Sequence, residues 1–131
     1  MTSLAALLGA LMTALQTHPL CDQVRVVETR EFSPHQFYFK IRAELCQNMH
    51  FQVRVYHNQG HADYAYQLFT DVPLLRWDNK EEFRHLKTCP HHHHDDKGGI
   101  YPSPLTGNPV EDIDVVLQEI AAFLDRENRS E

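Results

Sequence analysis

Strict alternation of apolar and polar residues between positions 35 and 57 is the feature that most restricts the fold of this chain. In the segment HQFYFKIRAEL, residues 35–45, every second residue from Phe37 to Leu45 is apolar. The segment HFQVRVYHNQG, residues 50–60, repeats the pattern with Phe51, Val53 and Val55. Successive side chains of a strand point to opposite faces, so this pattern predicts strands with one buried face and one polar face.

Three further segments have the composition of strands. They are CDQVRVVETREF (21–32), HADYAYQLFT (61–70) and PLLRWDN (73–79). The turns between segments are short, with Ser33-Pro34 after the first strand and Asn58-Gln59-Gly60 after the third. Connections this short join antiparallel neighbours. The sequence therefore predicts an antiparallel sheet of about five strands in a meander.

Amphipathic helices are expected at both ends of the chain. In the first 18 residues, Leu4, Leu7, Leu11 and Leu15 recur at helical spacing, Thr2 or Ser3 is available as a cap, and His18-Pro19 ends the pattern. No Lys or Arg precedes Arg25, so we interpret this segment as a helix of the folded domain and not as a secretion signal.

The second helix is expected over residues 108–129. Asn108 is the predicted N-cap, Pro109 occupies the first helical position, and Glu111 is predicted to complete a capping box. Both helices can cover the apolar face of the sheet. We therefore predict an α+β fold in which residues 1–131 form a single globular domain with both helices packed on one face.

Charge and cysteine content limit the class of protein. The net charge of −6 argues against broad, charge-driven binding to nucleic acid, although it permits a local basic patch. The polar face of the sheet would carry such a patch, with two aromatic residues, at Tyr38, Lys40, Arg42, Arg54 and Tyr56. The three cysteines include no CxxC pair, which favours a reduced, cytoplasmic protein. The N-terminal apolar run is too short and too interrupted by Thr and Gln to span a bilayer, so no membrane segment is expected.

Two polar motifs contain the candidate site residues. The first, Arg76-Trp77-Asp78-Asn79, lies where the last predicted strand gives way to a loop. An arginine provides a planar fork that fits a phosphate, and an aspartate can orient an imidazole. A purely structural alternative remains, in which Arg76 and Asp78 form an ion pair and Trp77 belongs to the core.

The second motif is the run His91–His94, which we expect in irregular chain because Pro and Gly punctuate the region. If the run is extended, His91 and His93 share one face and His92 and His94 share the other. One pair could supply the acid and base of a phosphodiester cleavage. Alternatively, His91, His93 and Asp96, or Cys89 in place of the aspartate, could bind Zn²⁺ or Mn²⁺. A solvated loop that binds metal only adventitiously is the third interpretation.

The order and spacing of these motifs resemble the TumE-type toxins over residues 56–124. In that family an Arg-aromatic-Asp-Asn motif is followed by Pro-His-His-x-His and a C-terminal helix, and Pro90, His91, His92 and His94 fit the second motif. Trp77 stands where tyrosine is more usual. The family's additional Pro-His-His is replaced here by residues 80–85, where His85 alone is similar. The resemblance implies an intracellular toxin encoded beside a helix-turn-helix antitoxin.

Three functional hypotheses follow. In the first, the toxin is a metal-independent ribonuclease without a cofactor. His92 or His94 removes the 2′-OH proton, His85 protonates the leaving oxygen, Arg76 stabilises the phosphorus oxygens, and Asp78 fixes an imidazole tautomer. The aromatic and basic residues of the polar sheet face would bind the RNA.

In the second hypothesis the protein is a metal-dependent hydrolase or nuclease that uses His91, His93 and Asp96. In the third it is a non-catalytic binding protein that blocks translation. The sequence leaves open whether the protein forms a homodimer.

Overall fold

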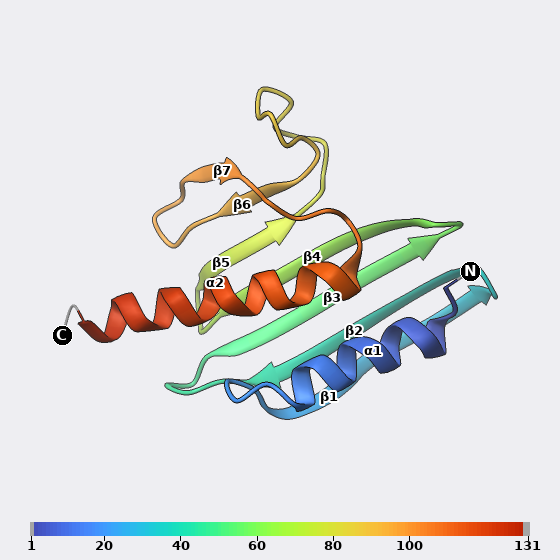
Figure 1. Cartoon of the computed structure of the whole chain (residues 1–131), viewed down its shortest axis with the longest axis horizontal. Coiled ribbons are helices and arrows are strands. Elements are labelled where there is room, and N and C mark those ends of the chain that lie inside the picture. The colour runs from blue at the N-terminus through green and yellow to red at the C-terminus, as the bar shows by residue number, and fades with distance from the viewer. Residues whose placement is uncertain (1, 130–131) are drawn as a thin grey trace.

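The computed structural model describes residues 2–129 and contains two helices and one seven-stranded antiparallel sheet (Figure 1). The strands follow one another in sequence order, so the predicted α+β meander is confirmed with two additional strands. The elements are α1 (Leu4–Gln16), β1 (Asp22–Ser33), β2 (Gln36–Glu44), β3 (His50–Asn58), β4 (His61–Phe69), β5 (Pro73–Asp78), β6 (His92–His94), β7 (Ile100–Pro102) and α2 (Pro109–Arg129).

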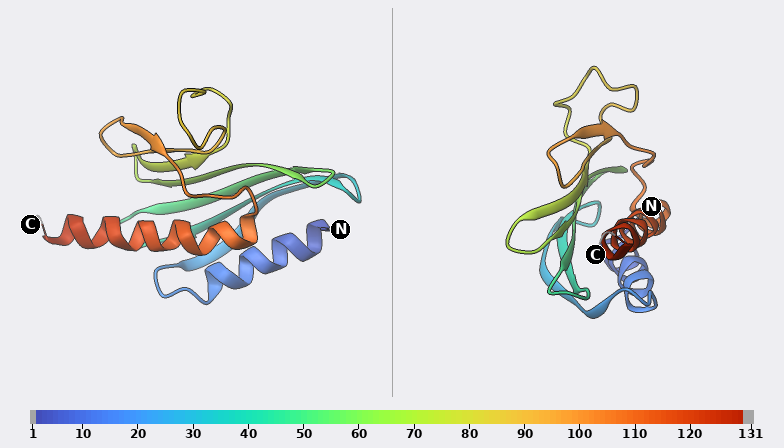
Figure 2. Two further views of the ribbon diagram at one scale, coloured as in Figure 1. Left: turned by 45° about the horizontal axis from the view of Figure 1, so that its top comes forward. Right: turned by 90° about the vertical axis from the view of Figure 1, so that its left-hand side faces the viewer.

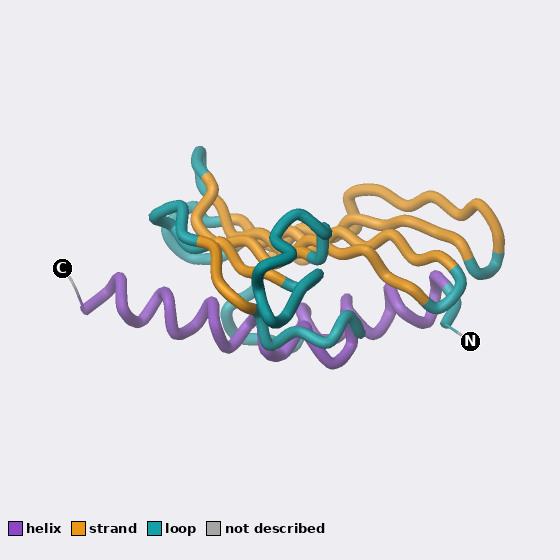
Figure 3. Tube along the Cα trace, turned by 90° about the horizontal axis from the view of Figure 1, so that it is seen from above, coloured by secondary structure: helices purple, strands orange, loops and turns teal. Residues whose placement is uncertain are grey.

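Both helices lie on the same face of the sheet, as the sequence predicts (Figure 2). Alternate residues of β2 and β3, such as Phe39 and Val53, are fully buried against the helices. Leu11 of α1 and Ile120 of α2 complete the same core. Figure 3 shows the sheet from its edge, with the helices along one side and no helix along the other. We call these two sides the helix-covered face and the open face.

The register of β2 and β3 places the predicted basic patch on the open face. Tyr38 pairs with Tyr56, Lys40 with Arg54, and Arg42 with Gln52. Their neighbours along each strand are buried on the helix-covered face, so these side chains point the other way. The alternation in the sequence therefore predicts the orientation of all five residues.

The helix ends agree with the sequence in part. The Ser3 hydroxyl accepts from the Ala6 amide, which confirms the cap of α1, and the Asn108 side chain accepts from the Val110 amide. The capping box predicted for α2 is wrong, because the Asn108 amide donates to the Thr106 hydroxyl and not to Glu111. In residues 2–129, neither helix is long and apolar enough to cross a membrane.

The histidine run was expected in irregular chain, and the structure corrects this. Residues 92–94 form β6, which pairs with β5 on one side and β7 on the other. Because the ladder has a period of two, His92 and His94 lie on one face and His93 lies on the other, as the sequence predicts for an extended run. The segment between β5 and β6 extends beyond the sheet (Figure 2).

Candidate functional site

The pairing of β5 with β6 brings the two polar motifs together. Asp78 lies opposite His92, and Arg76 lies opposite His94. These four side chains share the open face, because the residue between each pair, Trp77 or His93, points to the helix-covered face. There Trp77 and His93 stack with ring centroids 4.8 Å apart and planes 2° apart.

The carboxylate of Asp78 is the centre of the site. Its side chain is only 4% exposed, and each of its oxygens has a polar partner. Arg76 Nε donates to Oδ2 at 2.7 Å, and His92 Nε2 lies 2.8 Å from Oδ1. The backbone amide of Lys80 also donates to Oδ1, at 3.1 Å. A buried carboxylate requires such partners to offset the loss of hydration.

The two imidazoles on the open face differ in accessibility. The His92 side chain is 2% exposed, and its second nitrogen, Nδ1, lies 3.1 Å from the carbonyl oxygen of Pro90. Both nitrogens therefore face acceptors, which fixes the position of the ring. The His94 side chain is 30% exposed, and its Nε2 lies 4.0 Å from Asp78 Oδ2. Burial lowers the pKa of His94 and the neighbouring His92 lowers it further, so the neutral imidazole is favoured.

Phe83 covers the two imidazoles, a contact that sequence reasoning missed. Its ring meets those of His92 and His94 edge-on, with centroids 4.6 and 5.8 Å away. His85 lies on the same loop and is exposed, with its ring centroid 6.4 Å from that of Phe83. The structure thus places His85 near the cover of the site and outside the hydrogen bonds around Asp78.

A cavity of about 510 Å³ on the open face adjoins Asp78. Its walls combine residues from both predicted sets: Arg76 and Asp78 with Tyr38, Arg54 and Tyr56. The guanidinium of Arg54 has no ion pair or hydrogen bond to another residue in the described part of the chain.

The remaining two residues of the predicted basic patch lie on the same face but do not line this cavity. Lys40 Nζ is 4.0 Å from a carboxylate oxygen of Glu28, and Arg42 donates to Gln52 at 2.6 Å. Lys40 therefore faces a carboxylate and Arg42 a neutral amide, whereas Arg54 has neither partner.

The residues that the structure brings close enough to bind a metal ion differ from those predicted from the sequence. Between residues 2 and 129, the histidine, cysteine and acidic groups close enough to share an ion are Asp78, His92 and His94, whose ligand atoms lie within 4.8 Å of one another. The predicted set is dispersed: His91 contacts Tyr64, His93 stacks on Trp77, and Asp96 is exposed. Two imidazoles and a carboxylate suit Zn²⁺ or Mn²⁺, but Arg76 and His92 already engage both carboxylate oxygens.

The combination of motifs and geometry agrees with the comparison with known families. The family model described as Toxin TumE matches residues 11–127. The chain belongs to the TumE toxin family. As a TumE protein it is the toxin of a toxin–antitoxin system and has an antitoxin as its partner. No curated protein and no solved structure matches the chain.

The TumE match covers both motifs and most of the chain. The structure adds that β5 pairs with β6, which places the two motifs side by side. Asn79, the last residue of the first motif, has a structural role that sequence reasoning missed. Its side chain donates to the Ala62 carbonyl and accepts from the Tyr64 amide, which secures the edge of β4 beyond the end of β5.

Proposed function

We propose that this TumE toxin is a metal-independent ribonuclease whose catalytic groups lie on the open face. One observation carries the proposal: a buried carboxylate, Asp78, holds both an arginine and an imidazole beside a second, accessible imidazole. Histidine is suited to proton transfer near neutral pH, and each such transfer contributes about 10²–10⁴ in rate. Arginine suits the charge that develops on a phosphate in the transition state.

The reaction begins with His94 as general base. Its neutral imidazole removes the proton of a ribose 2′-OH, and the 2′ oxygen forms a bond to the adjacent phosphorus. The bond between phosphorus and the 5′ oxygen breaks, which leaves a 2′,3′-cyclic phosphate and a 5′-hydroxyl. His85 supplies the proton for the departing 5′ oxygen, and Arg76 donates hydrogen bonds to the non-bridging oxygens. Asp78 and His92 act as positioning residues.

Binding of single-stranded RNA is assigned to the cavity beside this site. Tyr38 and Tyr56 offer ring faces on which bases stack, and the unpaired guanidinium of Arg54 offers a charge for the backbone. Lys40 and Arg42 extend the same face along β2. Arg54 thus provides a local positive charge in a chain whose net charge is −6, and the acidic residues Asp63 and Glu81 line the same cavity.

The test is cleavage of a single-stranded RNA in the presence of EDTA. We expect wild-type protein to cleave, and His94→Gln and Arg76→Ala each to lose about 10²–10⁴ in rate. His35→Gln and Arg129→Ala are matched controls, because His35 lies in the β1–β2 turn and Arg129 ends α2 on the other side of the sheet, and neither lines the open-face cavity. Both controls should retain wild-type rates.

Two results would contradict the proposal and favour the alternatives. If EDTA abolished cleavage and Zn²⁺ or Mn²⁺ restored it, Asp78, His92 and His94 would act as metal ligands. If purified protein cleaved no RNA but stopped translation in a cell-free mixture, the toxin would act by binding alone.

A further inference from the structure

A second and larger cavity lies on the other side of the sheet, near the open-face cavity. Its volume is about 940 Å³, and it lies between the tip of the β3–β4 hairpin, the first residues of both helices, and Pro90-His91. His61, Asn79 and Pro90 line both cavities. We call the larger one the helix-side cavity.

The two cavities meet where β5 ends. Strand β4 begins at His61, but β5 pairs with it only as far as Ala65, opposite Asp78. Beyond that point the side chain of Asn79 bonds to the backbone of Ala62 and Tyr64 in place of a strand. The two cavities therefore adjoin at this edge, so a polymer bound on the open face lies next to the helix-side cavity.

The helix-side cavity contains a polar group without a partner. His57 is 7% exposed and stacks on Phe37 with ring centroids 4.7 Å apart. Its Nδ1 atom has no hydrogen-bond partner in the described chain. Nδ1 is itself buried, so a ligand in the cavity would contact the exposed part of the imidazole and not this atom.

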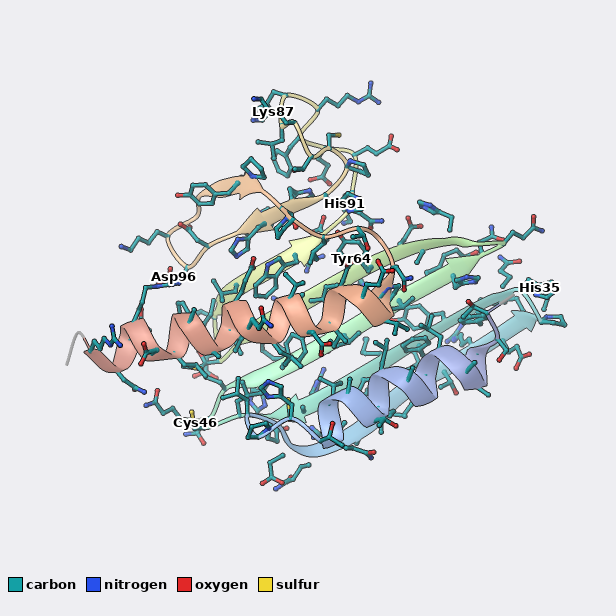
Figure 4. All side chains as sticks on the ribbon, in the orientation of Figure 1. His35, Cys46, Tyr64, Lys87, His91 and Asp96 are labelled. Atoms are coloured by element: carbon teal, nitrogen blue, oxygen red, sulfur yellow. The ribbon has the colours of Figure 1, made fainter. Side chains whose placement is uncertain are left out.

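His91 also lines this cavity, and it is bonded to Tyr64, which does not line it. The Tyr64 hydroxyl and His91 Nδ1 are 2.7 Å apart, and their rings are near-parallel at 9° (Figure 4). Gly107 approaches the same imidazole closely, since a Cβ there would lie 3.3 Å from His91 Cε1. Burial lowers the pKa of His91 and raises that of Tyr64, so both groups are favoured in their neutral forms.

The chemistry of the walls selects a neutral, planar ligand. In the described chain, the lining residues include no Lys or Arg, and the buried carboxylate of Asp112 lies behind Gly107, to whose amide it is bonded. These features disfavour a phosphate. Imidazole rings and side-chain amides offer flat surfaces and neutral donors and acceptors, which suit the edges and faces of a nucleobase. The volume falls in the range of small-molecule sites.

We propose that the helix-side cavity binds the base and sugar of the RNA nucleotide next to the scissile phosphate. This inference rests on the proposed ribonuclease function and specifies its substrate: a single strand that turns around the edge of β4, with its phosphate near Asp78 and one nucleoside among His57, His61 and His91. The site would thereby select single-stranded over paired RNA, because a paired base cannot leave its helix to enter the cavity.

The test separates binding from cleavage. Adenosine, guanosine, cytidine and uridine are titrated into the full-length protein, and amide shifts are followed by NMR. We expect at least one nucleoside to shift the amides of Gly107 and Asn108. Ala6→Trp fills the cavity from an exposed helix position, and we expect it to weaken this binding by about tenfold or more. Ala5→Trp is the matched control, because Ala5 is exposed on α1 but does not line the cavity.

The outcomes distinguish this inference from the proposed function. If none of the four nucleosides shifts these amides, the inference is overturned even if the protein cleaves RNA. If a nucleoside binds but no RNA is cleaved, the proposed function fails, while the cavity remains a nucleoside site. Equal cleavage of single-stranded RNA by Ala6→Trp and Ala5→Trp would also overturn the subsite. Val110→Trp, at a 47% exposed lining residue of α2, repeats the test if Ala6→Trp does not fold.

Discussion

The two faces of the β5–β6 ladder use adjacent residues for different purposes. On the helix-covered face Trp77 is fully buried, stacks on His93 and donates from Nε1 to Glu119 of α2. On the open face Arg76 and His94 remain about 30% exposed around the buried Asp78 carboxylate. Because strand side chains alternate, the residues that pack in the core and those proposed to act in catalysis are adjacent in both strands. Substitutions at neighbouring positions should therefore have separable effects.

The largest expected effect on stability comes from Trp77→Ala. Removing a fully buried indole should lower the free energy of unfolding by about 3–5 kcal/mol. Arg76→Ala, one residue away, should lower it by about 1–3 kcal/mol, because the buried Asp78 carboxylate loses one polar partner but keeps those from His92 and the Lys80 amide. Urea denaturation of both variants measures the difference. Equal losses would show that the open face is as important for stability as the core.

The helix-covered face is the part of the fold that the sequence predicts best. The alternation in β2 and β3 identifies the buried residues, and Asn108-Pro109 predicts the start of α2 within one residue. Burial imposes these patterns directly, so they can be read from one sequence. The orientation of Tyr38, Arg54 and Tyr56 follows from the same period, whereas the other three long strands are predicted from composition and turns.

The sequence names Arg76, Asp78, His92 and His94 as candidates, but it does not predict how the fold brings them together on the open face. A run of four identical histidines has no apolar period, so the sequence does not reveal that residues 92–94 form a strand. Only tertiary pairing with β5 places His92 opposite Asp78. Phe83 was missed for a similar reason: an isolated aromatic residue in a polar loop has no local signal that identifies its contacts with His92 and His94.

An intermediate effect is expected on RNA affinity, which tests the open face alone. Arg54 lines the open-face cavity without a partner, so Arg54→Ala should weaken RNA binding about threefold to tenfold. The salt dependence of the binding constant should show about one fewer counterion released. Binding is measured with a 2′-deoxy substrate, which cannot be cleaved by the proposed route. The control is Arg129→Ala, because Arg129 is paired with Asp125 at 3.1 Å on α2, away from the open face. An equal loss in both variants would indicate a diffuse charge effect and no defined RNA path.

The smallest expected effect comes from Glu119→Gln on the helix-covered face. Burial raises the pKa of Glu119, and the hydrogen bond from Trp77 opposes this only in part. A raised pKa in the folded state means that Glu119 favours folding when protonated, and this contribution is lost as pH rises through the folded pKa. Near neutral pH the ionised carboxylate therefore opposes folding, whereas glutamine still accepts from the indole without carrying charge.

Glu119→Gln should accordingly raise the free energy of unfolding at pH 7 by less than about 1 kcal/mol, a modest value because the side chain is only half-buried. The gain should disappear below about pH 4, where the carboxyl group is protonated in both folded and unfolded chains. Thermal melts across this range measure it, with Asp114→Asn on the exposed side of α2 as the control. A gain that grew as the pH fell would mean that the ionised carboxylate supports the indole, and that a charge stabilises the helix-covered face as well as the open one.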